Sequence, residues 1–192
     1  MLTLYFAPGA SSMAPHIALH EIGVPFDARP ISFHRQEQQS PAYLALNPEG
    51  KVPTLVIDGR PLTEVAAILF YLARRFPKAK LLPDGPEAEA QALSWMSFAA
   101  STLHPARRHG LDHAKAAYGL ADARMAGRGW IFGSYSIADI HLFRLFWRFN
   151  NSLQPGANAF PNLAAHQERM LNRPAVQRTL EKEAAIGYEL PA

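Results

Sequence analysis

Short apolar runs and longer amphipathic stretches alternate over the first 76 residues. Residues 2–6, LTLYF, end shortly before a Pro-Gly pair, which predicts a buried strand followed by a turn. A helix over 13–22 can follow with Ser12 as its best N-cap, because Pro15 is tolerated only in the first turn of a helix. The other elements predicted in this region are a strand around 25–31, a short helix within 34–48, two strands within 52–64 joined by an Asp58-Gly59 turn, and a helix over 65–76.

The pattern changes after residue 76. Residues 77–87 are rich in proline and charge, which is typical of a linker between domains. No convincing strand signal follows, and the apolar positions recur with helical spacing. Helices are predicted over 88–104, about 112–127, 136–149, 162–172 and 174–186. The sequence therefore predicts an α/β domain over 1–76 and an all-α helical bundle domain over 88–192.

Composition limits the chemistry. Of the 192 residues, 48% are hydrophobic and 18% are charged, which indicates an ordinary globular protein. The net charge of +3 comes from scattered lysines and arginines, so we expect no nucleic-acid partner. The chain has no cysteine, which excludes disulfides, thiolate metal sites and a protein thiol nucleophile, so any thiol chemistry must use a substrate's sulfur. Since neither a secretory signal nor an apolar run of roughly 20 residues is present, we expect a cytoplasmic protein with no membrane partner.

The segment 47–56, NPEGKVPTLV, is a candidate peptide-binding edge. An X-Pro bond has only a small preference for trans, and a cis Val52–Pro53 bond would leave the backbone groups of Val52 unpaired where the strand begins. Such an edge can bind a peptide by strand addition. The alternative is a plain transition from loop to strand, since only ~5–6% of X-Pro bonds are cis.

Two further patterns place polar groups at the starts of predicted helices. Glu64 precedes the helix over 65–76, so its carboxylate could receive an ammonium group while the helix amides receive a carboxylate; alone, it is an ordinary favourable charge at a helix start. Ser11 lies just outside the helix over 13–22, where its hydroxyl could steady a thiolate; alone, a serine pair before a helix is usually a cap. Lowering a thiol pKa of ~8.5 by about two units requires about 2.7 kcal/mol, the size of one hydroxyl bond to an anion plus a helix end.

Taken in order along the chain, these patterns resemble the glutathione transferases. The hallmarks are NPEGKVP, LTE before an apolar helix, and SIAD at 136–139, and the resemblance covers nearly the whole chain. Ser136 and Asp139 also predict a capping box by themselves. The stretch PGASSMAPHIALHE is most similar to the bacterial beta class, in which a cysteine occupies the place of Ser11. The resemblance implies a thioredoxin-like domain followed by a C-terminal helical domain.

The resemblance also implies roles for individual residues. The backbone of Val52, before Pro53, would pair with the cysteinyl part of glutathione, while Glu64 and the amide of Val65 would hold its γ-glutamyl end. Lys51 would meet the glycine carboxylate. The candidate catalytic residues are Ser11, Ser12, Tyr5 and His104. Tyr5 competes with Ser11 for thiol activation, with core packing as its simpler interpretation, and His104 matches a beta-class active-site histidine by position, although alone it would be an ordinary helix histidine.

The implied activity is that of a glutathione transferase: the thiol of glutathione attacks a small hydrophobic electrophile, in detoxification by a cytoplasmic homodimer. The alternatives are a glutathione-dependent isomerase or peroxidase, or a non-catalytic glutathione-binding protein of the same fold. The last is favoured by the short segment between His104 and Trp130, which has only 25 residues. No metal is expected, because His109 and His113 have the helical spacing of a ligand pair but no third ligand is evident.

Overall fold

The computed structural model describes residues 1–156 and 158–190. The chain divides into two compact units, of which one comprises Met1–Arg75 with the residues from Pro174 onward and the other comprises Phe76–Arg173. We call them the sheet unit and the helical unit. Their content confirms the predicted fold class, a thioredoxin-like α/β domain followed by an all-helical domain.

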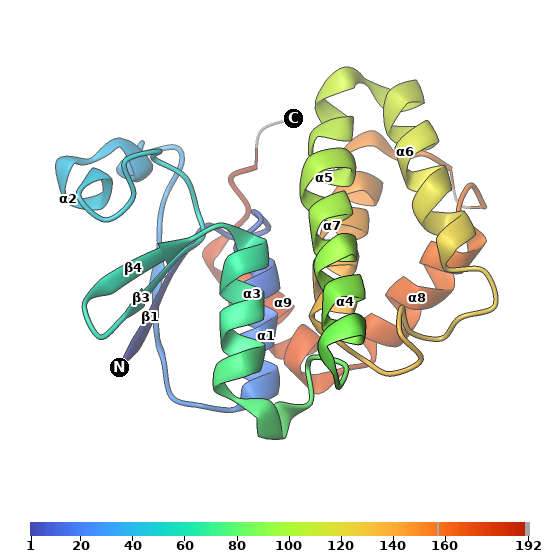
Figure 1. Ribbon diagram of the computed structural model, residues 1–192. Coiled ribbons are helices and arrows are strands. Elements are labelled where there is room, and N and C mark those ends of the chain that lie inside the picture. Colours follow the sequence, from blue (N-terminus) through green and yellow to red (C-terminus); the bar gives the residue numbers. More distant parts are fainter. Residues whose placement is uncertain (157, 191–192) are drawn as a thin grey trace. The chain divides into compact units, whose positions relative to one another are not determined.

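A mixed four-stranded sheet forms the centre of the sheet unit (Figure 1). Its strands are β1 Leu2–Phe6, β2 Asp27–Pro30, β3 Thr54–Ile57 and β4 Arg60–Thr63, in the order β2-β1-β3-β4. Strand β1 runs parallel to β2 and antiparallel to β3. The predicted hairpin between β3 and β4 is confirmed, and Asp58 and Gly59 at its turn both have positive φ, 48° and 84°.

Two helices, α1 Met13–Ile22 and α3 Val65–Arg75, lie side by side against one face of this sheet (Figure 1). Ile17 of α1 and Leu72 of α3 are both 0% exposed, so the two helices share a core. Gly23 ends α1 in the left-handed conformation, φ 75°, which glycine adopts without steric cost. The connection between β2 and β3 contains two short segments, η1 Glu37–Gln39 and α2 Pro41–Leu44.

The last helix, α9 Pro174–Ile186, spans the residues predicted for it but packs against α1 in the sheet unit. Its buried residues recur at helical spacing and form one face: Ala175, Val176, Thr179 and Glu183. The helical domain expected over 88–192 included this helix, because periodicity reveals that a helix has a buried face without revealing what covers it.

The helical unit contains α4 Pro86–Phe98, α5 His104–Ala106, α6 Leu111–Arg124, α7 Ile137–Leu153 and α8 Pro161–Leu171, with short turns at η2 Pro77–Ala79, η3 Ala99–Leu103 and η4 Arg107–His109. Helix α7 is buried along most of its length. The helix predicted over 88–104 is interrupted at η3, a π-helical turn directly before His104. Such turns are rare and are frequent at functional sites. No helix in the described part of the chain is long and apolar enough to span a membrane.

The capping box predicted at the start of α7 is confirmed. Ser136 Oγ accepts from the N–H of Ala138 at 3.3 Å, and Asp139 Oδ2 accepts from the N–H of Ser136 at 2.9 Å. Asp139 is fully buried, and its other oxygen accepts from the N–H of Ile131 at 3.0 Å and lies 3.1 Å from His166 Nε2. One carboxylate therefore joins the start of α7 to the loop before it and to α8.

Candidate functional site

The loop between β1 and α1 meets the start of β3 at Ser11. The Oγ of Ser11 donates to the carbonyl of Val52 at 2.9 Å, and Ser11 stays partly exposed. The Val52–Pro53 bond is cis, which agrees with the predicted cis bond and not with a trans bond in a plain loop-to-strand transition. Within the described chain the N–H of Val52 has no acceptor. A backbone donor and a backbone carbonyl are therefore available beside the Ser11 hydroxyl, as strand addition of a peptide requires.

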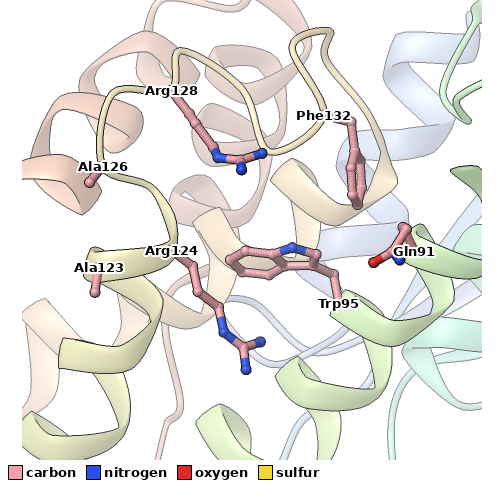
Figure 2. A pocket seen from close by; sticks show the side chains of 7 residues that line it. All are labelled: Gln91, Trp95, Ala123, Arg124, Ala126, Arg128 and Phe132. Atoms are coloured by element: carbon pink, nitrogen blue, oxygen red, sulfur yellow. The ribbon is translucent and has the colours of Figure 1, made fainter.

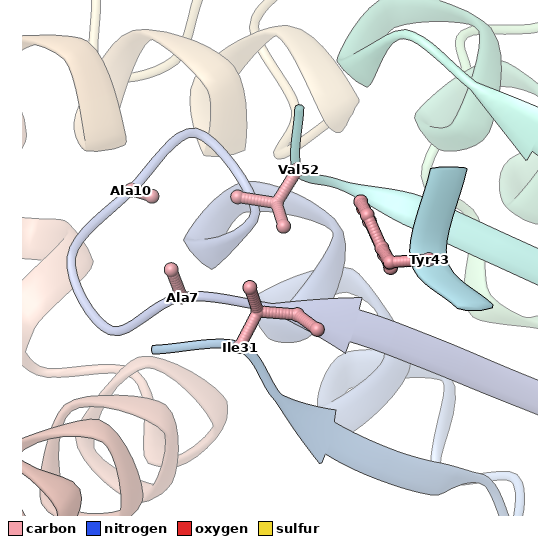
Figure 3. Packing of buried hydrophobic residues seen from close by; sticks show 5 residues of the cluster. All are labelled: Ala7, Ala10, Ile31, Tyr43 and Val52. Carbon is pink, nitrogen blue, oxygen red and sulfur yellow. The ribbon is translucent and has the colours of Figure 1, made fainter. Parts of the chain in front are cut away.

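An apolar cluster supports the loops that carry Ser11 and Val52 (Figure 3). Its buried members are Ala7, Ala10, Ile31, Tyr43 and Val52. The hydroxyl of Tyr43 donates to the carbonyl of Lys51 at 2.6 Å and lies 2.9 Å from Thr54 Oγ1. Burial raises the pKa of Tyr43, so this hydroxyl stays a neutral donor. The segment around Val52 is thus supported by the packed cluster and by the hydrogen bonds of Tyr43.

The other two candidate hydroxyls have different partners. Ser12 is fully buried, and its Oγ accepts from the N–H of Ala7 and donates to the carbonyl of Ala7, at 3.1 Å each. It occupies the N-cap position predicted for α1, but its side chain makes no capping bond, because Ala7 engages it. The hydroxyl of Tyr5 accepts from Arg29 of strand β2 at 3.2 Å. Of these three hydroxyls, that of Ser11 bonds to Val52.

Glu64 lies immediately before α3 in a left-handed backbone conformation, φ 67°. Positive φ is uncommon outside glycine, and residues held in it cluster at functional sites. The Glu64 carboxylate is exposed and has no partner in the described chain, and the N–H of Val65, in the first turn of α3, has no acceptor there. A carboxylate beside open helix amides suits the two opposite charges of an α-amino acid.

Lys51 lies one residue before Val52 and carries an exposed ammonium group. Its Nζ is 2.8 Å from Glu49 Oε2, and both side chains are largely in solvent. Exposed ion pairs of this kind contribute only about 0–1 kcal/mol. A ligand carboxylate could therefore compete with Glu49 for Lys51.

A buried carboxylate from α9 holds the loop that carries Ser11, and the sequence analysis missed it. Glu183 is fully buried; its Oε2 accepts from the N–H of Gly9 at 2.7 Å, and its Oε1 lies 2.8 Å from Nδ1 of the equally buried His16. Glu183 follows Thr179 at helical spacing. A glutamate on the apolar face of a predicted helix is therefore the feature of the sequence that could have indicated a buried carboxylate.

A second glutamate near the end of the chain holds the loop after β2. Glu189 accepts from the hydroxyl of Ser32 at 2.9 Å and from the N–H of His34 at 3.0 Å. These bonds, that of the His34 backbone above all, lower the pKa of Glu189. Glu183 within α9 and Glu189 after it therefore hold two loops of the sheet unit, and no local pattern in the sequence indicates the role of Glu189.

His104 opens α5 in the helical unit, where it is half-buried. Burial above all, and then the positive charges of Arg144, Arg108 and Arg107, lower its pKa to about 4. The imidazole is therefore neutral at pH 7 and can offer one N–H donor and one acceptor nitrogen.

His141 is expected to make the stability of the protein sensitive to acid. Burial, followed by the charges of His104 and Arg144, lowers the pKa of His141 to about 3, from an ordinary value near 6.5. The unfolded chain therefore binds a proton that the folded chain rejects, so stability is retained above pH ~6.5 and falls as the pH drops toward ~3. At about 1.4 kcal/mol per pKa unit, we expect His141 to remove about 2 kcal/mol between pH 7 and pH 5.

Urea unfolding at a series of pH values checks this expectation. The variant His141→Leu should lose less stability than the original protein on going from pH 7 to pH 5, whereas a control at the exposed His109, His109→Gln, should follow the original curve. Parallel curves for His141→Leu and the original protein would show that another group causes the acid sensitivity.

A separate cavity of about 470 Å³ lies in the helical unit, and Figure 2 shows Trp95 in it between Arg124 and Arg128. The guanidinium of Arg124 is 3.9 Å from the centre of the Phe98 ring. None of the predicted site residues lines this cavity. In the described residues no group of three His, Cys, Asp or Glu side chains could hold a metal, although the rings of His109 and His113 lie 5.0 Å apart.

Comparison with known proteins gives a consistent result. The N-terminal domain model of glutathione S-transferase matches residues 1–74, and the C-terminal domain model matches residues 66–174. Glutathione S-transferase GstA of Escherichia coli O157:H7 is 31% identical, over 95% of this chain and 98% of that protein.

Two solved structures share the fold along almost the whole chain. A glutathione transferase homologue from Sulfitobacter, with bound glutathione, has a TM-score of 0.89 at 32% identity and covers 95% of this chain and 98% of its own. A bacterial beta class glutathione S-transferase from Sphingomonas chungbukensis has a TM-score of 0.85 at 34% identity and covers 94% and 98%. With both domain models and a relative of nearly equal length in agreement, this chain belongs to the glutathione S-transferase family.

Proposed function

We propose that this glutathione transferase activates the thiol of glutathione with the hydroxyl of Ser11. The observation that supports the proposal is the 2.9 Å bond from Ser11 Oγ to the carbonyl of Val52, next to the open N–H of the same residue. A glutathione that pairs with the Val52 backbone would place its cysteinyl sulfur near this hydroxyl. Because the chain has no cysteine, the thiol must come from glutathione itself.

Binding of the tripeptide would use groups that the sheet unit leaves available. The cysteinyl residue would pair with the N–H and carbonyl of Val52 as an added strand. The γ-glutamyl end would place its ammonium group on Glu64 and its carboxylate on the N–H of Val65. The glycine carboxylate would meet Lys51, in competition with the exposed Glu49.

The Ser11 hydroxyl can donate only one hydrogen bond, so activation of the thiol depends on where that bond is directed. The side chain of Ser11 has one hydroxyl proton, and in the structure that proton is donated in a hydrogen bond to the carbonyl of Val52. The cysteinyl N–H of glutathione would bring a second donor to that carbonyl, so that Ser11 could direct its proton to the sulfur. A hydrogen bond to an anion contributes about 1.5–3 kcal/mol, enough to lower the thiol pKa by about one to two units. The thiolate then attacks the electrophile, and the carbon–sulfur bond forms as the leaving group departs.

The electrophile would be a small hydrophobic molecule, and His104, whose imidazole is neutral at pH 7, is the candidate catalytic residue of the helical unit. A cytoplasmic homodimer acting in detoxification completes the proposal. Sedimentation equilibrium of the purified chain should give a mass of twice 21.2 kDa, and a single-chain mass would contradict the dimer.

The variant Ser11→Ala tests the assigned hydroxyl. We expect the pKa of the bound glutathione thiol to rise by about one to two units, because the thiolate loses its hydrogen bond while the pairing with Val52 remains. Thiolate absorbance against pH reports the pKa, and calorimetry reports the affinity for glutathione, which should change less than about threefold.

Tyr5→Phe is the comparison variant. The hydroxyl of Tyr5 bonds to Arg29, so its removal should leave the pKa of the bound thiol unchanged. A shift in Tyr5→Phe without a shift in Ser11→Ala would reverse the assignment. Failure of the folded original protein to bind glutathione would overturn the proposed function as a whole.

A further inference from the structure

The cavity of about 470 Å³ in the helical unit combines aromatic rings with positive charge, and no residue proposed for glutathione chemistry lines it. Its lining includes Gln91 and Trp95 of α4, Arg124 at the end of α6, and Arg128 and Phe132 of the segment that connects α6 to α7. All of these residues belong to the helical unit. The volume falls within the roughly 300–1,000 Å³ typical of small-molecule sites. We call this space the α4–α6 cavity.

Two guanidinium groups at the α4–α6 cavity are held in place and still have N–H donors available. Arg128 donates from Nη1 to the carbonyl of Ile131 at 3.1 Å, and the Arg124 guanidinium lies 3.9 Å from the centre of the Phe98 ring. Neither side chain has a further hydrogen bond or an ion pair with a described residue, and no described residue that lines the cavity is acidic. Because a guanidinium carries several N–H donors, most of them are available to an anion. Contacts that fix a side chain before a ligand arrives also reduce the entropy that binding costs.

Trp95 provides a flat ring surface between these two charges. Figure 2 shows its indole between the two guanidinium groups, with Phe132 and Gln91 at one end of the cavity. The indole packs on the Phe98 ring at an interplanar angle of 83°, with the ring centres 5.8 Å apart, so its orientation is fixed. The amide of Gln91 has no hydrogen bond with another described residue and can both donate and accept. A flat ring with polar edges and an attached anion matches these features.

We infer that the α4–α6 cavity binds a nucleoside monophosphate, a ligand that joins a flat heteroaromatic base to a phosphate. The base stacks on Trp95, as bases stack on aromatic side chains in other proteins, and Gln91 pairs with its polar edge. The phosphate accepts two parallel N–H bonds from Arg128, and Arg124 adds a second positive charge that suits a dianion. The ligand is bound without any change in its covalent bonds, so this inference does not depend on the proposed function.

A free nucleotide fits the molecule better than a strand of nucleic acid. Binding of a strand requires a clustered stripe of positive charge, whereas the lysines and arginines of this chain are scattered. One indole also provides a stacking surface for a single base. A short deoxyadenosine strand that binds far more tightly than adenosine monophosphate would assign the surface to nucleic acid and overturn the inference.

Adenosine monophosphate and adenosine form a matched pair that tests the phosphate contact. Calorimetry of the original protein should give a dissociation constant about tenfold or more lower for the nucleotide, because hydrogen bonds to a charged group are among the strongest. Arg128→Gln should raise the value for the nucleotide about tenfold and leave that for adenosine within about twofold. Equal dissociation constants for the two ligands in the original protein would overturn the inference.

Lys115→Gln is the matched control, because it removes an equal charge from an exposed position on α6 that does not line the cavity. It should leave the dissociation constant for adenosine monophosphate within about twofold. A loss as large as that in Arg128→Gln would mean that general attraction to a basic protein explains the binding, and the site would be wrong.

Ribose 5-phosphate lacks the base and therefore tests the stacking. The original protein should bind it about tenfold more weakly than adenosine monophosphate, since stacking on an aromatic side chain adds affinity for each base. Trp95→Leu should reduce the affinity for the nucleotide to that for ribose 5-phosphate. This variant keeps both arginines, so it tests the site even where Arg128→Gln does not fold. Full affinity for the nucleotide in Trp95→Leu would show that the α4–α6 cavity is not the binding site.

Titration in the presence of S-methylglutathione separates this inference from the proposed function. The dissociation constant for adenosine monophosphate should stay within about threefold when S-methylglutathione is saturating. Loss of nucleotide binding under these conditions would place the nucleotide at the glutathione site and overturn the inference. If the protein binds the nucleotide as described but does not bind glutathione, the proposed function is wrong and the nucleotide site stands.

Discussion

Replacing Asp139 with alanine is expected to lower the free energy of unfolding by about 3–5 kcal/mol. The Asp139 carboxylate is fully buried and accepts from the N–H groups of Ile131 and Ser136 and from Ser136 Oγ, at 2.9–3.0 Å. It also lies 3.1 Å from His166 Nε2, and His166 is itself 0% exposed. Alanine would leave all of these donors buried without an acceptor, which costs far more than the loss of one exposed cap.

Urea unfolding at pH 7 measures this effect. The control is Asp112→Ala, which removes a carboxylate from the first turn of α6 at an exposed position and should change stability by less than about 0.5 kcal/mol. Asp139→Ala should shift the midpoint with a similar slope. A loss below about 1 kcal/mol would mean that water or a rearranged loop replaces the carboxylate.

Replacing Glu183 with alanine is expected to lower the free energy of unfolding by about 3 kcal/mol or more and to reduce kcat/KM for glutathione. Glu183 accepts from Gly9 N–H at 2.7 Å and pairs with His16 at 2.8 Å, in a site where its side chain and that of His16 are 0% and 1% exposed. Gly9 and Ser11 belong to the same loop, so this change should affect both folding and the position of the hydroxyl proposed to activate the thiol.

Glu181→Ala is the control for this prediction, because Glu181 carries the same charge on the exposed face of α9. It should leave stability within about 0.5 kcal/mol and leave the pKa of the bound thiol unchanged. In Glu183→Ala the thiol pKa should rise as in Ser11→Ala, though by less. Unchanged stability in Glu183→Ala would show that the buried carboxylate is not needed for folding. Unchanged kcat/KM would show that its bond to the loop does not affect catalysis.

Local patterns in the sequence were sufficient for many of the helices and strands, although not for the π-helical turn that interrupts the helix predicted over 88–104. The apolar run at 2–6 forms β1, and the helix expected over 13–22 forms with the same bounds, since Gly23 ends it in a left-handed conformation. The capping box at Ser136 and Asp139 also forms as predicted. Each of these features depends on groups within a few residues of each other, so the spacing of residue types encodes it.

The hydrogen bonds of the site residues could not be predicted in the same way. The sequence placed Ser12 at the start of α1, yet its hydroxyl bonds to Ala7 instead of capping the helix. It placed Ser11 outside that helix without indicating that Val52, 41 residues away, would accept from its hydroxyl. A hydroxyl has several local and distant partners of similar strength, and packing selects among them.

The sequence by itself determined the order of the elements, the two kinds of structure and the motifs that identify the family. The tertiary structure alone decided that α9 packs on α1 and that Glu183 reaches Gly9 across 174 residues. The physical reason is that periodicity and capping reflect interactions over one or two helical turns, whereas these contacts depend on which buried faces meet when the chain folds.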